Sequence, residues 1–481
     1  MYCIIKSLLL IIILHHFFIN NMEENMKIFT NEDYIELRKN SNEIFKDKVH
    51  ETRINDMMQE KWDIIRNFPY KSYRSIRKWQ LERISYLVDY AYENIPLYRK
   101  KYDAVGYKKG SIKTWKDYEK LPILTKEELI NGFPNEIVKN LEDFNISTRS
   151  SGSSGKFVTL AVSQEAIYID TIQGFRQYYL QSGNNYDPKD VVLFIYTCPW
   201  WITRVNGKFR SEFLPTTTKI DDAIEKIKKL RPRIISTYPT YLERISSRGV
   251  CLSEYGVETV IVHSEQSSRA FRKKLEKELD VKIVDEYSSE ELTRIALECS
   301  YNHYHLEEDA CYVEAVDSKT FKKVKYGEPG ILIGTNLLNT ATPIIRYNQG
   351  DLVILNKPID CKCGNKCRTM NNVQGRFMDS ILIGKDEYVP ASSFMDIAYN
   401  WYLEFNIPVH GLRYQFVQYE KNELTLYLIK GSFDLDLKII EKSIYLLIPK
   451  TMKLEIELVD EFPNIKGHKY RPVINLWKGG K

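Results

Sequence analysis

One stretch of the chain consists almost entirely of hydroxyl residues and glycine. It runs from Ser147 to Lys156 and reads STRSSGSSGK, so Arg149 and Lys156 are its only other residue types. Small residues let backbone N–H groups and hydroxyls close around phosphate oxygens, and a lysine adds positive charge. The stretch is not a Walker A sequence, because its Gly-Lys pair is not followed by Ser or Thr. It indicates a phosphate-binding loop, with a solvated Ser/Gly linker as the alternative from composition alone.

A second group with defined chemistry is a cluster of cysteines and histidines. Five of the eight cysteines lie from Cys299 to Cys367, and the last three have the spacing C-x-C-x3-C. Eight cysteines in 481 residues are too few for a disulfide scaffold, which indicates reduced thiols. Thiolate and imidazole ligands at short spacings suit a tetrahedral zinc site, which is structural when it has no open position. We expect the ligands Cys299, His305, Cys361 and Cys363, with His303 and Cys367 as substitutes, Cys311 as a weaker one, and buried free thiols as the alternative.

The composition predicts a soluble globular protein. Hydrophobic residues make up 43% of the chain and charged residues 28%, which supplies a core and excludes a disordered or fibrous chain. Lys and Arg number 69 against 64 Asp and Glu, and no basic block occurs that would follow a phosphate backbone. A nucleic-acid partner is therefore not expected. The 481 residues have room for about three domains, or for one large domain with a smaller companion.

The N-terminal segment is unlike the rest of the chain. The run from Ile4 to Ile19 is apolar apart from four residues, and it is shorter than the roughly 20 residues of a spanning helix. No small-residue cleavage site follows it, as a signal peptide would require. We interpret residues 1-25 as a hydrophobic N-terminal extension or a misassigned start, with translation beginning at Met22 or Met26. Membrane association is expected only if this segment is real, and a cytoplasmic location otherwise.

The elements that must position these groups follow from hydrophobic periodicity. Apolar positions from Trp79 recur at steps of three and four, which predicts an amphipathic helix stopped by Pro96. Further along, short β-rich runs alternate with helical patterns at Ala223–Leu230 and Ser268–Leu279. This order predicts an α/β body with a substantial sheet, whose strands are expected at Val191–Tyr196, Ile234–Thr237, Thr259–His263, Val281–Tyr287 and Ile331–Leu337.

Beyond Gly375 the pattern changes to that of a separate α+β unit. A short hairpin is expected around Gly384–Glu387. The further elements are helices at Ser392–Tyr402 and Leu435–Leu447, and strands at Leu412–Tyr419, Glu423–Lys430 and Leu454–Asp460. The chain has no internal repeat and no low-complexity linker.

The order of five motifs resembles that of the acyl-adenylate-forming superfamily. The Ser/Gly loop is followed by YSSEE at 287–291, RYNQGDL at 346–352, GRFMD at 375–379 and GHKYR at 467–471. Two earlier segments, LVDYAYENIPLYR at 87–99 and LPILTKEEL at 121–129, are similar to the opening of the phenylacetate-CoA ligase family and its CapK-like relatives. The resemblance extends from about residue 75 to 475. It implies a large N-terminal AMP-binding domain at 26-375, with mixed sheets and helices, and a small mobile C-terminal lid domain at 376-481.

The resemblance also implies a two-step reaction. A carboxylate attacks the α-phosphate of ATP to give an acyl-adenylate and pyrophosphate, and a thiol or another nucleophile then displaces AMP. The first step needs N–H donors, a divalent cation and a lysine around the phosphates, because negative charge builds on their oxygens. By position in the family's motifs, the phosphate loop would consist of Ser150, Ser151, Gly152, Ser153, Ser154, Gly155 and Lys156.

The remaining motifs imply further contacts to the nucleotide. Tyr287 would stack against adenine, Glu291 would bind magnesium, and Asp351 would accept hydrogen bonds from both ribose hydroxyls. Lys469 matches the lysine that bridges the carboxylate and the α-phosphate during adenylation in relatives, and Arg346 and Arg376 match arginines that face phosphate and ribose. Cysteine and histidine positions similar to those of this chain hold a structural zinc in many family members.

Three residues depart from the family's motifs. Glu290 stands where relatives usually carry threonine beside the magnesium-binding glutamate. Met378 replaces the first member of an acidic pair at the hinge, which leaves Asp379, and His468 replaces the glycine before the lysine. These changes bear on a thioester-forming step more than on nucleotide binding.

The acid-binding pocket is expected by analogy beside Trp200 and Trp201, and its aromatic walls favour an aryl or medium apolar acid. Its further members would be Tyr238, Pro239, His263 and Ser264, although the same residues would also suit a packed core. The leading interpretation is an ATP-dependent carboxylate-CoA ligase that uses ATP, Mg²⁺, coenzyme A and structural Zn²⁺. The alternatives are a CapK-like adenylating enzyme that transfers to an amine or carrier thiol, and a non-catalytic nucleotide-binding scaffold. The expected partner is a small-molecule carboxylic acid, with a homodimer left open.

Overall fold

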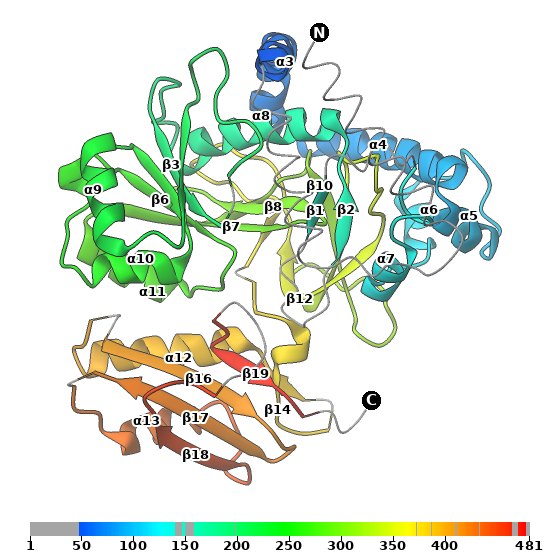
Figure 1. Cartoon of the computed structure of the whole chain (residues 1–481). Helices are drawn as coiled ribbons and strands as arrows, with labels where there is room; N and C mark the ends of the chain where they lie inside the picture. Colours follow the sequence, from blue (N-terminus) through cyan, green and yellow to red (C-terminus); the bar gives the residue numbers. More distant parts are fainter. Residues whose placement is uncertain are drawn as a thin grey trace, which may run out of the picture.

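The computed structural model (Figure 1) describes residues 48–139, 147–149, 158–197, 199–371, 373–385, 387–408, 411–431, 433–463 and 470–477. Several residues that the sequence singled out lie outside this part of the chain. They are the N-terminal segment 1-25, the phosphate-loop residues 150–156, and His468 with Lys469.

Five parallel strands form one half of an 11-stranded sheet, in the order β4, β3, β5, β6, β7 (Figure 1). Alternate side chains point to opposite faces: Leu193 and Ile235 pack beneath the helices α9 to α11, whereas Val192 and Ile234 pack against α3 and α8. Since both faces are covered, β3, β5 and β6 consist mainly of buried residues. The strands are β3 (Val192–Tyr196), β4 (Ser211–Pro215), β5 (Ile234–Thr237), β6 (Thr259–His263) and β7 (Lys282–Ser289). The helices are α3 (Lys48–Asn67), α8 (Gln164–Gln181), α9 (Ile220–Leu230), α10 (Pro239–Ser246) and α11 (Arg269–Leu279), with η3 at Ser253–Tyr255.

The other half of the sheet is antiparallel and continues from β7 in the order β8, β9, β13, β12, β11, β10. It shares a hydrophobic core with the helices α4 to α7. Its strands are β8 (Thr293–Glu298), β9 (Tyr304–Leu306), β10 (Cys311–Val316), β11 (Pro329–Asn336), β12 (Tyr347–Asn356) and β13 (Thr369–Met370). The helices are η1 (Phe68–Tyr70), α4 (Tyr73–Asn94), α5 (Pro96–Asp103), α6 (Trp115–Glu119) and α7 (Lys126–Gly132), and β1 (Ser147–Arg149) pairs with β2 (Thr159–Ala161).

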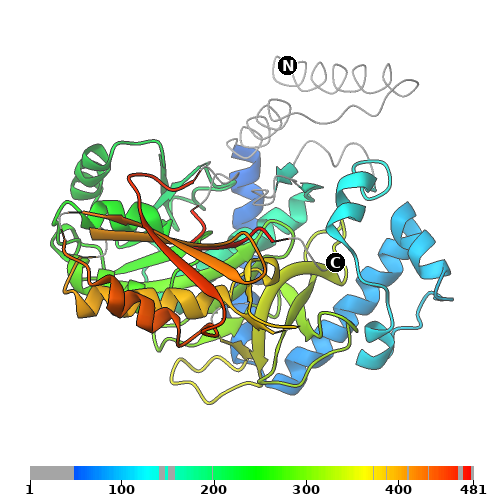
Figure 2. The same cartoon turned by 90° about the horizontal axis from the view of Figure 1, so that it is seen from below.

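The C-terminal elements, orange to red in Figure 2, build a second, four-stranded sheet with its own core. Its strands follow the order β18, β17, β16, β19. The short segment η4 (Phe377–Asp379) precedes it and contacts both β12 and β19. The elements are β14 (Ile381–Leu382), β15 (Tyr388–Val389), α12 (Ala391–Glu404), β16 (Leu412–Gln418), β17 (Glu423–Lys430), α13 (Leu437–Ile444), β18 (Lys453–Leu458) and β19 (Val473–Asn475).

The predicted α/β fold class is confirmed. The helix expected from Trp79 is α4, which ends at Asn94, before Pro96. The expected strands and C-terminal elements are present with ends shifted by up to three residues, whereas α8, α10 and most of the antiparallel strands were not anticipated. No helix in the described part of the chain combines the length and the apolar character needed to cross a membrane.

The antiparallel half of the sheet contains buried arginines that pair with carboxylates. Arg176 of α8 is 1% exposed, and its Nη1 donates to Asp309 Oδ2 at 2.6 Å and to the carbonyl oxygen of Ile65 at 2.8 Å. Its Nη2 also donates to Glu307, so one guanidinium neutralises two carboxylates that burial would otherwise leave without a counter-charge. This network connects α8 to the turn between β9 and β10.

We expect Arg176→Met to lower the free energy of unfolding by about 3–5 kcal/mol, because it leaves two buried carboxylates unpaired. Urea denaturation of the full chain measures the loss. The matched control is Arg210→Met, since Arg210 is 49% exposed, pairs with Glu212 and should change stability by less than about 1 kcal/mol. Equal losses in the two variants would contradict the assigned importance of the buried network.

Candidate functional site

Three residues that the sequence assigned to nucleotide binding meet at the carboxylate of Asp351. Asp351 lies on β12 and is 6% exposed. Its Oδ1 accepts from Nε of Arg376 at 2.8 Å, and its Oδ2 accepts from the hydroxyl of Tyr287 on β7. Arg376 also donates through Nη1 to the carbonyl oxygen of Gln349 at 2.8 Å. The structure thus brings a carboxylate, a phenol and a guanidinium together from β7, β12 and the segment after Gly375.

This ion pair joins a buried carboxylate to a partly exposed guanidinium, since the side chains of Asp351 and Arg376 are 8% and 44% exposed. The charge of Asp351 raises the pKa of Arg376, so its guanidinium stays cationic. Burial, together with the Asp351 charge, raises the pKa of Tyr287, so its phenol stays neutral and acts as a donor. A carboxylate has about four lone-pair positions, and these two donors use only part of that capacity. Asp351 can therefore accept additional hydroxyl donors at the same place.

Glu291 is buried close to these residues, in the turn between β7 and β8. Its side chain is 5% exposed, and Oε1 accepts from the hydroxyl of Tyr347 at 3.2 Å. Burial raises the pKa of Glu291, and the Arg376 charge opposes that shift. A divalent cation beside this carboxylate would favour its ionised form and would find the hard oxygen ligand that it prefers. Tyr347, which the sequence did not single out, holds the carboxylate in place.

The predicted phosphate contact of Arg346 does not agree with its position. Its guanidinium is 4% exposed and lies in the interior, where Nε donates to Glu314 Oε1 at 2.8 Å. Nη1 donates to the carbonyl oxygens of Glu119 and Leu121. These partners use the guanidinium to join β12 to β10 and to the loop after α6, so we correct its role to a structural one.

The residues expected to line the acid pocket lie at the carboxyl ends of parallel strands. The rings of Tyr196 and Tyr238 are stacked with centroids 5.2 Å apart, and the His263 ring lies 5.5 Å from that of Tyr238. His263 Nδ1 is 2.9 Å from the hydroxyl of Ser264, and Pro239 begins α10. His263 and Tyr238 are 5% and 8% exposed, so they form a packed aromatic wall. Because β6 pairs with β7, this wall is adjacent to the strand that carries Tyr287.

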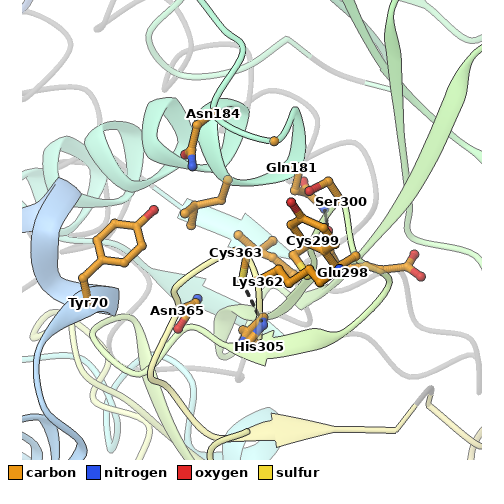
Figure 3. Close-up of a pocket in the computed structure, with 14 residues that line it drawn as sticks. Tyr70, Gln181, Asn184, Glu298, Cys299, Ser300, His305, Lys362, Cys363 and Asn365 are labelled. Atoms are coloured by element: carbon orange, nitrogen blue, oxygen red, sulfur yellow. Dashed lines mark hydrogen bonds between the residues drawn. The ribbon is translucent and has the colours of Figure 1, made fainter. Parts of the chain in front are cut away.

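The structure brings together the four ligand atoms that the sequence assigned to zinc. The sulfurs of Cys299, Cys361 and Cys363 and a ring nitrogen of His305 all lie within 4.8 Å of one another. Cys299 Sγ is 3.8 Å from Cys361 Sγ, and Cys363 Sγ is 3.3 Å from His305 Nε2 (Figure 3). Two thiolates on a tetrahedral zinc with bonds of about 2.3 Å would be roughly 3.8 Å apart. The donor types and their spacing therefore fit zinc.

The alternative ligands are in different positions. His303 lies at the edge of the cluster, with Nδ1 3.4 Å from Cys361 Sγ. Cys367 packs against Phe68 and Ile76, and Cys311 lies in the core of the antiparallel half. A hydrogen bond from Cys363 and another from His305 hold the pKa of Cys299 well below its usual value, which favours a metal-binding thiolate.

The segment expected to act as a hinge is fixed by an ion pair that the sequence did not reveal. The guanidinium of Arg471 donates to Asp379 Oδ1, and Asn475 Nδ2 donates to the carbonyl oxygen of Ser380 at 2.9 Å. Burial raises the pKa of Asp379, whereas Arg471 lowers it. The only signal in the sequence was that Arg471 ends the GHKYR motif, two positions after Lys469. The neighbouring Met378 is 59% exposed.

A further carboxyl group is half-buried where the C-terminal elements contact α10 and α11. Glu243 of α10 lies close enough to Tyr402, Tyr414 and Tyr470 for its charge to raise their pKa values. Burial raises the pKa of Glu243 to about 7, and the charge of Arg413 opposes the shift. Lys274 of α11 also contacts the C-terminal elements, since it donates to the carbonyl oxygens of Tyr402 and Ile407. The contact between the two sheets thus covers a carboxyl group with aromatic side chains.

This raised pKa predicts that stability depends on pH. Because the pKa of Glu243 is higher in the folded chain, its stabilising effect is complete below about pH 4.5 and is lost as the pH rises through 7. Glu243→Gln should remove this dependence. Between pH 5 and 8, the unfolding free energy of the wild type should therefore fall by up to about 3 kcal/mol relative to that of the variant. Urea denaturation across that range measures the difference. Glu225→Gln, on the exposed face of α9, is the control, and parallel curves for Glu243→Gln and the wild type would contradict the prediction.

The relatives of the chain are acyl-CoA ligases. No family model matches it. It is 26% identical over 320 residues to phenylacetate-coenzyme A ligase of Escherichia coli strain K12, covering 63% of this chain and 72% of that protein. It is also 26% identical over 323 residues to phenylacetate-coenzyme A ligase of Thermus thermophilus, with 64% and 72% covered. A crystal structure of 2-hydroxyisobutyryl-CoA ligase in the postadenylation state aligns with a TM-score of 0.67 at 18% identity, covering 84% and 90% of the two chains. This last likeness describes the fold.

Proposed function

Because the chain belongs to the phenylacetate-CoA ligase family of acyl-adenylate-forming enzymes, we propose that it activates a carboxylic acid with ATP and transfers the acyl group to coenzyme A. In the first step the acid's carboxylate oxygen attacks the α-phosphorus and pyrophosphate leaves. In the second step the thiol sulfur of coenzyme A attacks the acyl carbon and AMP leaves. Both displacements need the nucleotide to be held firmly while its partner is brought into line.

The observation that carries this proposal is the arrangement at Asp351. Its carboxylate pairs with Arg376, is buried, and still has acceptor capacity, which suits the two neighbouring hydroxyls of a ribose. Tyr287 donates to the same carboxylate, and we propose that its ring stacks against the base of that nucleoside. We assign these three residues to the AMP portion, and Glu291 to the magnesium ion that accompanies the phosphates.

Two parts of the proposed site rest on the motifs alone. The loop residues 150–156 would surround the β and γ phosphates, and Lys469 would bridge the carboxylate and the α-phosphate. We propose that the lid spans residues 376-481, since η4 contacts both β12 and β19. For the acid, the aromatic wall at Tyr238 and His263 favours an aryl or medium apolar acyl group.

We further propose a structural zinc at Cys299, His305, Cys361 and Cys363. The fit of three thiol sulfurs and one imidazole nitrogen within 4.8 Å supports it. When bound, the ion would supply a crosslink between the end of β8 with β9 and the loop before β13, and four protein ligands would leave it no open position for chemistry.

A cytoplasmic location agrees with the free thiols of the six described cysteines. The homodimer stays a prediction.

The test of the enzymatic proposal is ATP–pyrophosphate exchange with a panel of carboxylic acids. We expect exchange with at least one aryl or medium apolar acid, and an acyl-CoA product by mass spectrometry once coenzyme A is added. Lys469→Ala should reduce exchange by about 100-fold or more, because it removes a charge that meets the developing negative charge on the phosphates. Lys453→Ala, on the surface strand β18, is the control.

One outcome would contradict the ligase function, and another would contradict only the role of Lys469. If the protein binds ATP but exchanges pyrophosphate with no acid in the panel, the ligase function is wrong. Unchanged exchange in Lys469→Ala would refute the assigned role of the lysine while leaving the ligase function in place.

The zinc proposal predicts about one zinc ion per chain in metal-replete protein. Removal of the ion by a chelator should lower the midpoint of thermal unfolding by at least a few degrees, since a ligand that binds only the folded chain stabilises it. Elemental analysis should find that Cys299→Ser loses most of the metal, whereas Cys251→Ser, which changes a thiol beside Asp280 that is not part of the cluster, keeps it. Zinc well below one ion per chain in the wild type would rule out the site.

A further inference from the structure

A cavity of about 70 Å³ lies directly beside the cysteine cluster (Figure 3). Cys299, His305 and Cys363 form part of its wall, and Tyr70 of η1 and Asn184, from the loop after α8, form the opposite part. A cavity of about 10–15 Å³ already holds one water molecule, so this cavity has room for a small polar molecule such as hydrogen peroxide. Among the three cysteines of the cluster, Cys363 is half-buried, whereas Cys299 and Cys361 are buried.

The sulfurs are also placed for a reaction with one another. Cys299, a residue of the cavity wall, has its Sγ 3.8 Å from Cys361 Sγ, and the two residues come from different segments, the end of β8 and the loop after β12. A disulfide bond is about 2.05 Å long, so a modest approach of the two sulfurs would form one. Their spacing allows a disulfide as the end product when an oxidant reaches Cys299.

The other described cysteines are less suited to this chemistry. Cys311 and Cys367 are 2% and 1% exposed, and burial raises the pKa of each thiol, which disfavours the reactive thiolate. Cys251 lies next to Ser253 and the carboxylate of Asp280, at 3.2 and 3.8 Å from its sulfur. Within the described part of the chain, Cys251 belongs to no group of side chains that could hold a metal ion.

We propose that this cavity is a thiol modification site, at which hydrogen peroxide oxidises Cys299 and Cys361 to a disulfide and thereby releases the zinc. The inference rests on the proposed zinc site and goes beyond the ligase activity. The Cys299 thiolate attacks one peroxide oxygen, the O–O bond breaks, and with one proton from solvent a sulfenic acid and water form. Cys361 then attacks the sulfenic sulfur, and with a second proton the second water leaves. Two thiolates lose two electrons, and peroxide takes them up.

Oxidation would replace the zinc crosslink of this region by a disulfide crosslink. The disulfide keeps the end of β8 attached to the loop after β12, but it removes two of the four zinc ligands. Cys363 and His305 are then left as a pair that holds a zinc ion much less tightly. Reduction by a dithiol followed by added zinc should restore the original state, because a disulfide is reversible.

The experiment treats the zinc-loaded full chain with peroxide and follows zinc release with a chromogenic chelator. Disulfides are then located by mass spectrometry of non-reduced peptides after free thiols are alkylated. We expect up to one zinc per chain to be released, a Cys299–Cys361 peptide to appear, and Cys251→Ser to behave like the wild type. Tyr70→Ala, which enlarges the cavity, should speed release by roughly threefold or more, whereas Tyr70→Phe, which keeps the ring, should not.

The outcomes separate this inference from the zinc proposal. If the protein as purified carries no zinc, the zinc proposal fails, and disulfide mapping alone decides whether Cys299 and Cys361 are the preferred pair. Zinc that stays bound while peroxide oxidises Cys251 would overturn the modification site. A release rate that Tyr70→Ala leaves unchanged would show that peroxide does not enter through this cavity.

Discussion

The candidate site depends on how the carboxylate of Asp351 is satisfied. A buried carboxylate needs donors, and here they come from Tyr287 of β7 and from Arg376, the residue at which the chain leaves the large sheet. One side chain thus joins the parallel half of the sheet, the antiparallel half and the connection to the second sheet. A ribose that hydrogen-bonds to the same carboxylate would compete with, or add to, the partners that hold this connection. Nucleotide binding and the position of the hinge are then linked through a single pair of oxygen atoms.

The same requirement shapes the antiparallel half of the large sheet. Arg272, Arg346 and Arg368 are each at most 4% exposed, and each pairs with a glutamate on a neighbouring segment. Removing one partner would leave an uncompensated buried charge, so such pairs disfavour alternative strand registers. This explains why Arg346, in a motif that resembles a nucleotide-binding one, acts inside the protein. Asp351, by contrast, lies on β12, which begins directly after Arg346, and it faces the site.

These buried pairs also explain which parts of the structure the sequence could predict. The parallel strands are apolar on both faces, so runs such as Thr259–His263 were located to the residue. By contrast, Glu307, Glu308 and Asp309 have the composition of an exposed turn, yet they are at most 6% exposed because arginines distant in sequence neutralise them. Residue types and spacing sufficed to name the four members of the cysteine cluster. The partner of Asp379 is 92 residues away in the sequence, and the surroundings of Glu243 depend on the packing of the C-terminal elements against α10, so neither leaves a local pattern.

The exposure of the hinge residues bears on whether the altered hinge motif impairs function. Met378 stands where the resemblance expects the first acidic residue, and its side chain is 59% exposed. Asp379, the acidic residue that remains, is buried and forms the ion pair with Arg471. A carboxylate at position 378 would therefore face solvent in this arrangement, where an exposed charge contributes little to stability. The substitution removes no buried partner, and the ion pair that attaches η4 to the segment before β19 is intact. If position 378 matters for the second half-reaction, it must do so in a different arrangement of the two sheets, where that side chain meets a partner.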